Sequence, residues 1–311
     1  MSLQLTHYRD ASDYWRARAF FRSLPRPEGK AGGNWHVALF DSWRWHWLEN
    51  VVERQPDELC MWEDETGEIA AVLNQGDPGV CHVHVRPATR DEALLAEMVE
   101  TAEREYSTPS QSGGRVVWVW SMEDDEQLLR VLRSRGYETF VSEHAVEHYG
   151  RRPLDAPIRD VAVPEGFHIR SMGDVDEHGR RSLASWRAFH PDEPDTGCDM
   201  TGAWYRNVQR APLYRRDLDV VAIAPNGDIA SFAVCYFDDA TREGVFVLDG
   251  TAAAYQRLGL AKAVMTETLR RLQWLGATNA YVNWYEPPAG ALYESVGLRE
   301  EARGRAWMKR L

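Results

Sequence analysis

Long apolar runs and paired cysteines are both missing from this 311-residue chain. No stretch approaches the ~18 apolar residues that a membrane span needs, so no membrane insertion is expected. The four cysteines, Cys60, Cys81, Cys198 and Cys235, form no CxxC pair, which argues against a zinc ribbon or a disulfide framework. The first ten residues lack the basic and apolar segments of a secretory signal. We therefore expect a cytoplasmic protein with reduced thiols.

Positive charge is also scarce relative to negative charge. The sequence has 36 basic and 48 acidic residues, which gives a net charge of −12. Such a chain repels nucleic acid and anionic membranes at long range and attracts cations. The expected partner is a small molecule, with no nucleic acid and no membrane. No metal is expected either, because alternate residues on a strand face opposite ways and no distant ligand pair accompanies Cys81, His82 and His84.

The length of the chain predicts about two domains of ~150 residues each, and the two halves repeat each other. Short patterns recur in the same order and at nearly constant spacing. The matching segments are 7–9 and 168–170, 66–70 and 226–230, 79–80 and 244–245, and 135–137 and 296–298. A stretch rich in proline and charge separates the halves. We predict one domain over 1–150, a linker over 151–163 and a second domain over 164–311, in a monomer or a homodimer.

Each half has the pattern of an α/β (α+β) unit: a mixed, mostly antiparallel twisted sheet with helices on both faces. The second half shows this most clearly. A tight turn at 225–228 predicts a hairpin of strands 220–224 and 229–237. The run 245–248 is apolar on both faces, as in a central strand. Apolar residues at helical spacing predict a helix over 260–275, which Gly276 ends.

The segment between that central strand and that helix, YQRLGLA at 255–261, carries the most specific pattern. A helix N-terminus exposes unpaired N–H groups and a positive dipole end, so it can hold a pyrophosphate if small residues let it approach. Gln256, Gly259 and Ala261 stand where the pyrophosphate loop of GNAT acetyltransferases has its defining residues, and the segment resembles that loop. The resemblance implies that acetyl-CoA binds at Gln256, Arg257, Leu258, Gly259, Leu260 and Ala261.

A second resemblance to the GNAT superfamily follows 20 to 40 residues later. A strand ends at 281–283, and a helix with Glu286 and prolines at its start runs to Tyr293 and stops at Gly297. In the family, the two strands splay apart and the pantetheine arm of CoA enters the gap like an added strand. The resemblance implies hydrogen bonds from the backbone of Asp249, Gly250 and Thr251, with Asn283 on the facing strand. Glu286 departs from the family, which often has asparagine there, and this bears on contacts near the CoA arm.

The catalytic candidates come from the same resemblance. Tyr293 stands where family members place the general acid that protonates the departing thiol. Transfer from a tyrosine to a thiolate costs about 2 kcal/mol at ordinary pKa values, although packing against the sheet would also explain this aromatic residue. For the base that takes the proton of the amine, Glu243 and Asp249 are the candidates, with water as an intermediary. We favour Glu243, while a solvated loop acid and a turn residue remain the alternatives for these two positions.

The first half lacks both the glycine-containing loop and the tyrosine. Its equivalent loop, 86–93, has no glycine, and Val131 and Leu132 stand where Leu292 and Tyr293 would align. We therefore predict a degenerate domain that does not turn over acetyl-CoA. An aromatic cluster in this half could line an acceptor pocket shared between the domains, or pack in the core. Its members are His36, Trp43, Trp45, His46 and Trp47.

Taken as a whole, the chain resembles tandem GNAT proteins such as mycothiol synthase. This implies an N-acetyltransferase in which an amine attacks acetyl-CoA directly; the alternative is a non-catalytic acyl-CoA-binding or interaction module. The segment 190–204 lies where the family builds its acceptor wall. Because it carries Asp192, Glu193 and Asp195, we expect a cationic amine, such as a polyamine or an aminoglycoside-like compound.

Overall fold

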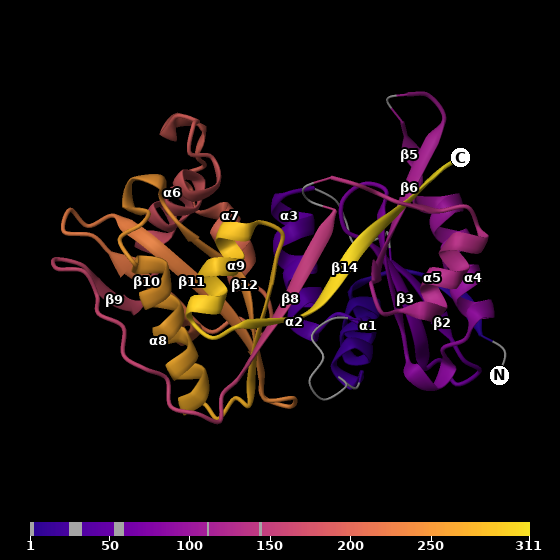
Figure 1. Cartoon of the computed structure of the whole chain (residues 1–311), viewed down its shortest axis with the longest axis horizontal. Coiled ribbons are helices and arrows are strands. Elements are labelled where there is room, and N and C mark those ends of the chain that lie inside the picture. The colour runs from indigo at the N-terminus through magenta and orange to yellow at the C-terminus, as the bar shows by residue number, and fades with distance from the viewer. Residues whose placement is uncertain (1–2, 25–32, 53–58, 111, 143–144) are drawn as a thin grey trace.

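A computed structural model of the chain describes residues 3–24, 33–52, 59–110, 112–142 and 145–311. Its strands form one continuous sheet in the order β1-β2-β3-β4-β6-β14-β8-β13-β12-β11-β10-β9. Neighbouring strands are antiparallel except for β4 with β6 and β12 with β13. Helices cover both faces at each end of the sheet (Figure 1). The predicted mixed, mostly antiparallel fold is thus confirmed.

The first half of the chain supplies one end of the sheet. Its strands are β1 (Gln4–His7), β2 (Leu59–Glu63), β3 (Ile69–Gln75), β4 (Val80–Val85), β5 (Thr108–Pro109), β6 (Arg115–Met122) and β7 (Glu138–Thr139). One face is covered by α1 (Ala11–Ser23), α2 (Val37–Ser42), the π-helical turn η1 (Trp43–Trp47) and α3 (Leu48–Asn50). The other face is covered by α4 (Glu92–Thr101) and α5 (Glu126–Ser134).

The second half supplies the other end. Its strands are β9 (His168–Ser171), β10 (Asp219–Ile223), β11 (Ile229–Asp238), β12 (Glu243–Thr251) and β13 (Asn279–Trp284), and its helices are α6 (His178–Phe189), α7 (Ala203–Gln209), α8 (Leu260–Trp274) and α9 (Pro287–Ser295). The predicted hairpin, central strand and long helix are confirmed, although β12 is longer at both ends than the apolar run 245–248. Helices α8 and α9 pack on one face and α6 and α7 on the other.

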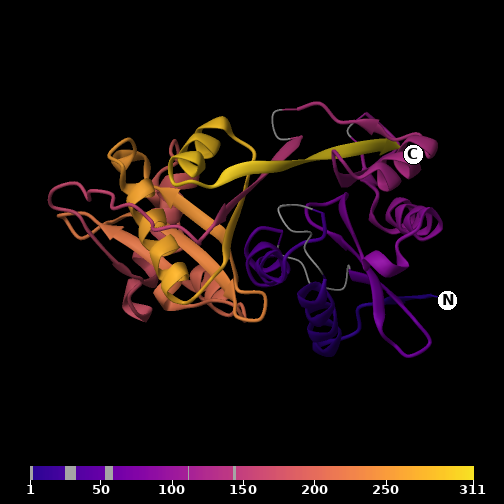
Figure 2. The same ribbon diagram turned by 60° about the horizontal axis from the view of Figure 1, so that its bottom comes forward.

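The two halves exchange their last strands. Strand β8 (Val146–Pro153) lies between β13 and β14, and β14 (Arg299–Arg310) crosses to pair with β6. Figures 1 and 2 show β14 bridging the two ends of the molecule. The predicted linker therefore begins too early, because residues 151–153 belong to β8. Composition suggested a linker there, but arginines and a proline are tolerated where β8 ends.

Burial follows from this arrangement. Central strands such as β3 and β11 have helices on both faces, and every residue in them is buried. Within the described ranges, none of the helices combines the length and the apolar character required to cross a bilayer.

Candidate functional site

The central parallel pair of the second half separates partway along its length. Strands β12 and β13 pair only from Glu243 to Val245 and from Asn279 to Tyr281. Beyond that point β12 stays paired with β11 out to Thr251, and β13 stays paired with β8 out to Trp284. The facing edges of the two strands therefore diverge, as the resemblance implied. An extended ligand can add to such an edge as a strand does.

The predicted backbone ligands lie on this diverging edge. Asp249, Gly250 and Thr251 follow an irregularity at which the register of β12 against β11 shifts. An extra residue of this kind bends a strand and increases its twist, which turns the end of β12 away from β13. The sequence motif located this edge, and the sheet register explains why it opens.

The loop at the end of the gap has the backbone of an anion site. Gly259 stands directly before α8 with a φ of 83°, and Arg257 has a φ of 64°. A Cβ placed at Gly259 would meet nothing within 4 Å, so the first turn of α8 is open to the outside. The amide groups at the start of a helix lack partners inside the helix and favour anions. Residues 256–259 thus form an exposed loop, and Leu260, which is buried, and Ala261 begin α8 directly after it.

Two of the catalytic candidates touch each other. The hydroxyl of Tyr293, on α9, donates to the carboxylate of Asp249, with distances of 3.1 and 3.2 Å to its two oxygens. Loss of hydration raises the pKa of Asp249 to about 6, and the hydrogen bond from Tyr293 opposes that rise. Burial is the main cause that raises the pKa of Tyr293 well above its ordinary value, and the nearby charge of Asp249 raises it further. The tyrosine stays protonated, while the carboxyl group exchanges protons close to neutral pH.

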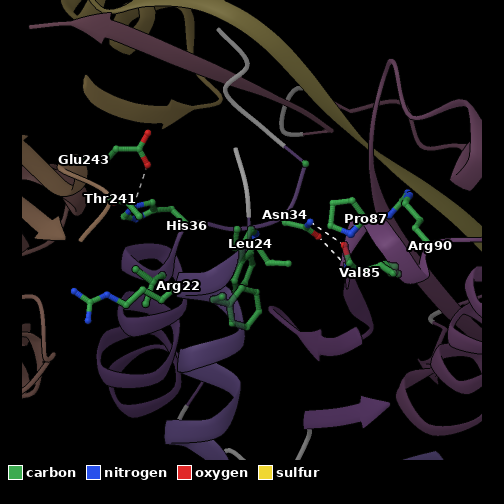
Figure 3. A pocket seen from close by; sticks show the side chains of 14 residues that line it. Arg22, Leu24, Asn34, His36, Val85, Pro87, Arg90, Thr241 and Glu243 are labelled. Atoms are coloured by element: carbon green, nitrogen blue, oxygen red, sulfur yellow. Dashed lines mark hydrogen bonds and ion pairs between the residues drawn. The ribbon is translucent and has the colours of Figure 1, made fainter. Parts of the chain in front are cut away.

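The other candidate base lies elsewhere. Glu243 is six residues before Asp249 on β12, a separation of about 20 Å along a strand. It accepts a hydrogen bond of 2.8 Å from the hydroxyl of Tyr281 and lies 3.4 Å from His36. Figure 3 shows it beside a cavity of about 410 Å³ that is also lined by Thr241. The structure therefore separates Glu243 from Tyr293.

The side chain of Asn283 contacts Glu147, a residue that the sequence analysis did not identify. Its amide donates to Glu147 on β8 over 3.2 Å, and the hydroxyl of Tyr149 donates to the other oxygen of the same carboxylate. Burial raises the pKa of Glu147 above its ordinary value, while the Tyr149 and Asn283 hydrogen bonds lower it. Nothing in the sequence links Glu147 to Asn283, because β8 comes from the first half of the chain.

The first half has a matching gap, which the chain itself fills. Strand β4 pairs with β6 only from Val80 to His82. At the diverging end, the side-chain amide of Asn34 donates to the carbonyl of Val85 over 3.0 Å and accepts from its N–H over 2.9 Å, as Figure 3 shows. The ring of Trp35 packs on His82, with centroids 4.6 Å apart. An arm that adds to β4 would have to displace these groups.

The tryptophans of the aromatic cluster belong to the core, and two of them also line a cavity. Trp45 donates to Tyr14 over 3.0 Å, and His46 packs on Trp204. Trp43 is buried in the core, Trp47 packs against that core, and both also line a cavity between the halves. Core packing therefore accounts for the three tryptophans without excluding a second role for two of them.

Two further predictions concern the acidic acceptor wall and the residues considered as metal ligands. In the expected acceptor wall, Asp195 forms an ion pair of 2.7 Å with Arg187, so its charge is already compensated. The only described group of three ligand-type atoms within 4.8 Å of one another is His7, Cys60 and Glu105. It does not include His82 or His84, and its His7 and Glu105 already form an ion pair.

Comparison with known proteins agrees with this geometry. No protein-family model and no curated protein sequence matches the chain. Among solved structures, a GCN5-related N-acetyltransferase from Sphaerobacter thermophilus is 16% identical with a TM-score of 0.65, over 99% of this chain and 95% of that one. A tandem GNAT protein from the clavulanic acid biosynthesis pathway is 12% identical with a TM-score of 0.64, over 99% and 98%.

A more distant likeness points the same way. Saccharomyces cerevisiae N-myristoyltransferase, solved with bound myristoyl-CoA, is 10% identical with a TM-score of 0.56, over 100% of this chain and 79% of that one. The chain therefore has the fold of the GNAT N-acyltransferases. More particularly, it has the tandem form of that fold, and the resemblance found in the sequence is confirmed at this level.

Proposed function

We propose that this protein is an acyl-CoA-dependent N-acyltransferase, and specifically an N-acetyltransferase that uses acetyl-CoA and a small-molecule amine. The observation that carries the proposal is the open gap between β12 and β13, with an uncapped helix start at one end and the Tyr293–Asp249 pair at its side. The likeness to GNAT enzymes supports it. Residues 1–150 are the degenerate unit of this proposal, and the competent site belongs to residues 164–311.

The loop before α8 would hold the pyrophosphate. The amides of the first turn of α8, which follow Gly259, have no partner inside the helix, and exposed Arg257 adds a positive charge beside them. Three or four charge-assisted hydrogen bonds of about 1.5–3 kcal/mol each are enough for micromolar affinity. The backbone of residues 249–251 would bind the pantetheine arm, and the backbone of Asn283 faces the same gap.

The chemistry needs one proton removed and one supplied. The nitrogen of a neutral amine attacks the thioester carbonyl, so that a C–N bond forms and the C–S bond breaks. Tyr293 gives its proton to the departing thiolate. Asp249 can take up, through water, the proton that the nitrogen loses. It can then return a proton to Tyr293. We assign this role to Asp249 in place of Glu243, because only Asp249 contacts Tyr293.

Calorimetric titration of acetyl-CoA and of CoA tests the proposal. Wild type is compared with Gly259→Trp, which places a bulky side chain in front of the helix start. The matched control is Gly67→Trp in a turn of the first half, where φ is 81° and a Cβ likewise meets nothing within 4 Å. We expect micromolar binding to wild type and to the control, and its loss in Gly259→Trp. Equal binding by all three proteins, or none by wild type, would contradict the proposal.

A further inference from the structure

A cavity of about 620 Å³ lies between the two halves and has aromatic walls. Its rings come from η1 and the turn before α2, from β6, and from the segments after β7 and β13. Six of the aromatic residues are Trp35, Trp47, Trp118, Trp120, Phe140 and Tyr285. Such surfaces hold apolar and aromatic groups, and their ring faces attract cations.

The charges that line this cavity are negative. Glu147 and Asp77 supply two carboxylates, and no Lys or Arg is among the lining residues that the structure describes. His82 also lines it, but burial lowers its pKa to about 3, so its ring is neutral. No described basic side chain forms an ion pair with Glu147. A buried carboxylate that forms an ion pair with none of the described basic side chains, and that faces aromatic rings, suits a ligand that brings its own positive charge.

Glu147 can accept a further hydrogen bond. A carboxylate offers about four lone-pair positions, of which Tyr149 and Asn283 occupy one each, and the pKa of Glu147 also reflects a hydrogen bond from Tyr285. The described residues therefore leave one position that an ammonium group can take. A charge-assisted bond of this kind is stronger than a neutral one.

The cavity also adjoins the gap between β12 and β13. Asn283 lines the cavity with its side chain and belongs to the part of β13 that has separated from β12. Glu147 is on the next strand, about 5 Å from β13. A nitrogen held near Glu147 and Asn283 is thus within a few ångströms of the edge at which the thioester would lie.

We propose that this cavity is the acceptor site and that it takes up a protonated amine with an aromatic body, positioned by Glu147. The ammonium group gives one proton to water before its neutral nitrogen attacks the thioester. The identity of the reaction in this inference rests on the proposed function. The predicted binding of the amine in the cavity does not depend on it. It replaces the acidic segment 190–204 as the source of selectivity for cations.

The test measures binding by tryptophan fluorescence and calorimetry with three probes: 2-phenylethylamine, 2-phenylethanol and n-butylamine. The variants are Glu147→Gln and Trp47→Leu. Glu123→Gln is the control, because that acid pairs with Arg305 and does not line the cavity. Wild type and the control should prefer 2-phenylethylamine to both other probes. Glu147→Gln should bind it about tenfold more weakly and no longer distinguish it from 2-phenylethanol.

Trp47→Leu keeps the test decisive if Glu147→Gln fails to fold. It should lose the preference for 2-phenylethylamine over n-butylamine. An unchanged ratio between amine and alcohol in folded Glu147→Gln would overturn the proposal, since a purely structural role leaves that ratio alone. Acetyl-CoA titrations separate the two claims: amine binding without acetyl-CoA binding overturns the proposed function only, and acetyl-CoA binding without amine binding overturns this inference only.

Discussion

The two halves of the molecule build the same gap and treat it differently. In the first half, Asn34 bonds both backbone groups of Val85 on the diverging strand. In the second half, β12 does not pair with β13 beyond Val245. Unpaired backbone groups inside a protein are costly. The first half satisfies them with its own side chain, and under the proposed function the second half leaves them for the cosubstrate. The pairing of the two central parallel strands is limited to three residues each in both halves, so this difference comes from Asn34 and not from the sheet.

The N-termini of helices α4 and α8 also differ between the two halves. Helix α4 is capped by the carboxylate of Asp91, which accepts from the amide of Leu94 and would repel a phosphate. Helix α8 follows Gly259, which has no side chain to form a cap. The first half thus differs from the second at two places, the strand edge and the helix start.

The largest effect is expected from Tyr293→Phe, which removes the acid of the second half. The turnover number should fall about 100-fold, because the thiolate then leaves without a proton donor, while acetyl-CoA affinity stays within about twofold. Tyr137→Phe, a buried tyrosine of the first half, is the matched control. Steady-state kinetics and calorimetry check both variants. Unchanged turnover in Tyr293→Phe would show that this tyrosine is not the acid, and acetyl-CoA binding without any transfer by wild type would make the protein an acyl-CoA-binding module.

A smaller effect is expected from Asp249→Asn. Wild-type rates should fall as the pH drops through about 6, where Asp249 takes up a proton, and the variant should lose this step together with about tenfold in rate at neutral pH. A pH–rate profile of kcat measures both. Glu243→Gln should change the rate less; a larger loss there than in Asp249→Asn would return the base to Glu243.

The smallest effect is expected from Asn34→Ala, which empties the gap of the first half. Loss of the two hydrogen bonds to Val85 should lower the free energy of unfolding by about 1–2 kcal/mol, as measured by urea denaturation. The stoichiometry of acetyl-CoA should remain one per chain, because Asp91 still caps α4. A second bound acetyl-CoA would show that Asn34 alone separates the two halves.

The sequence predicted what depends on local pattern. The hairpin, β12, α8 and the loop at 256–261 follow from turn residues, apolar periodicity and a glycine before a helix, and all are present. Contacts between distant segments were not accessible in this way. The hydrogen bonds from Asn34 to Val85 and from Asn283 to Glu147 join residues 51 and 136 positions apart. Glu243 was favoured as base because position along a strand does not reveal which side chains approach Tyr293.

The exchange of β8 and β14 has a consequence for how the protein is made. Strand β6 pairs with β4 within the first half, but its other edge gains a partner only when residues 304–310 arrive. During synthesis the first half therefore carries an unpaired sheet edge until the ribosome has passed Arg310. Exposed edges of this kind invite pairing with other chains. The first half can thus reach its final form only together with the second, and cutting the chain near residue 150 would leave two incomplete sheets in place of two domains.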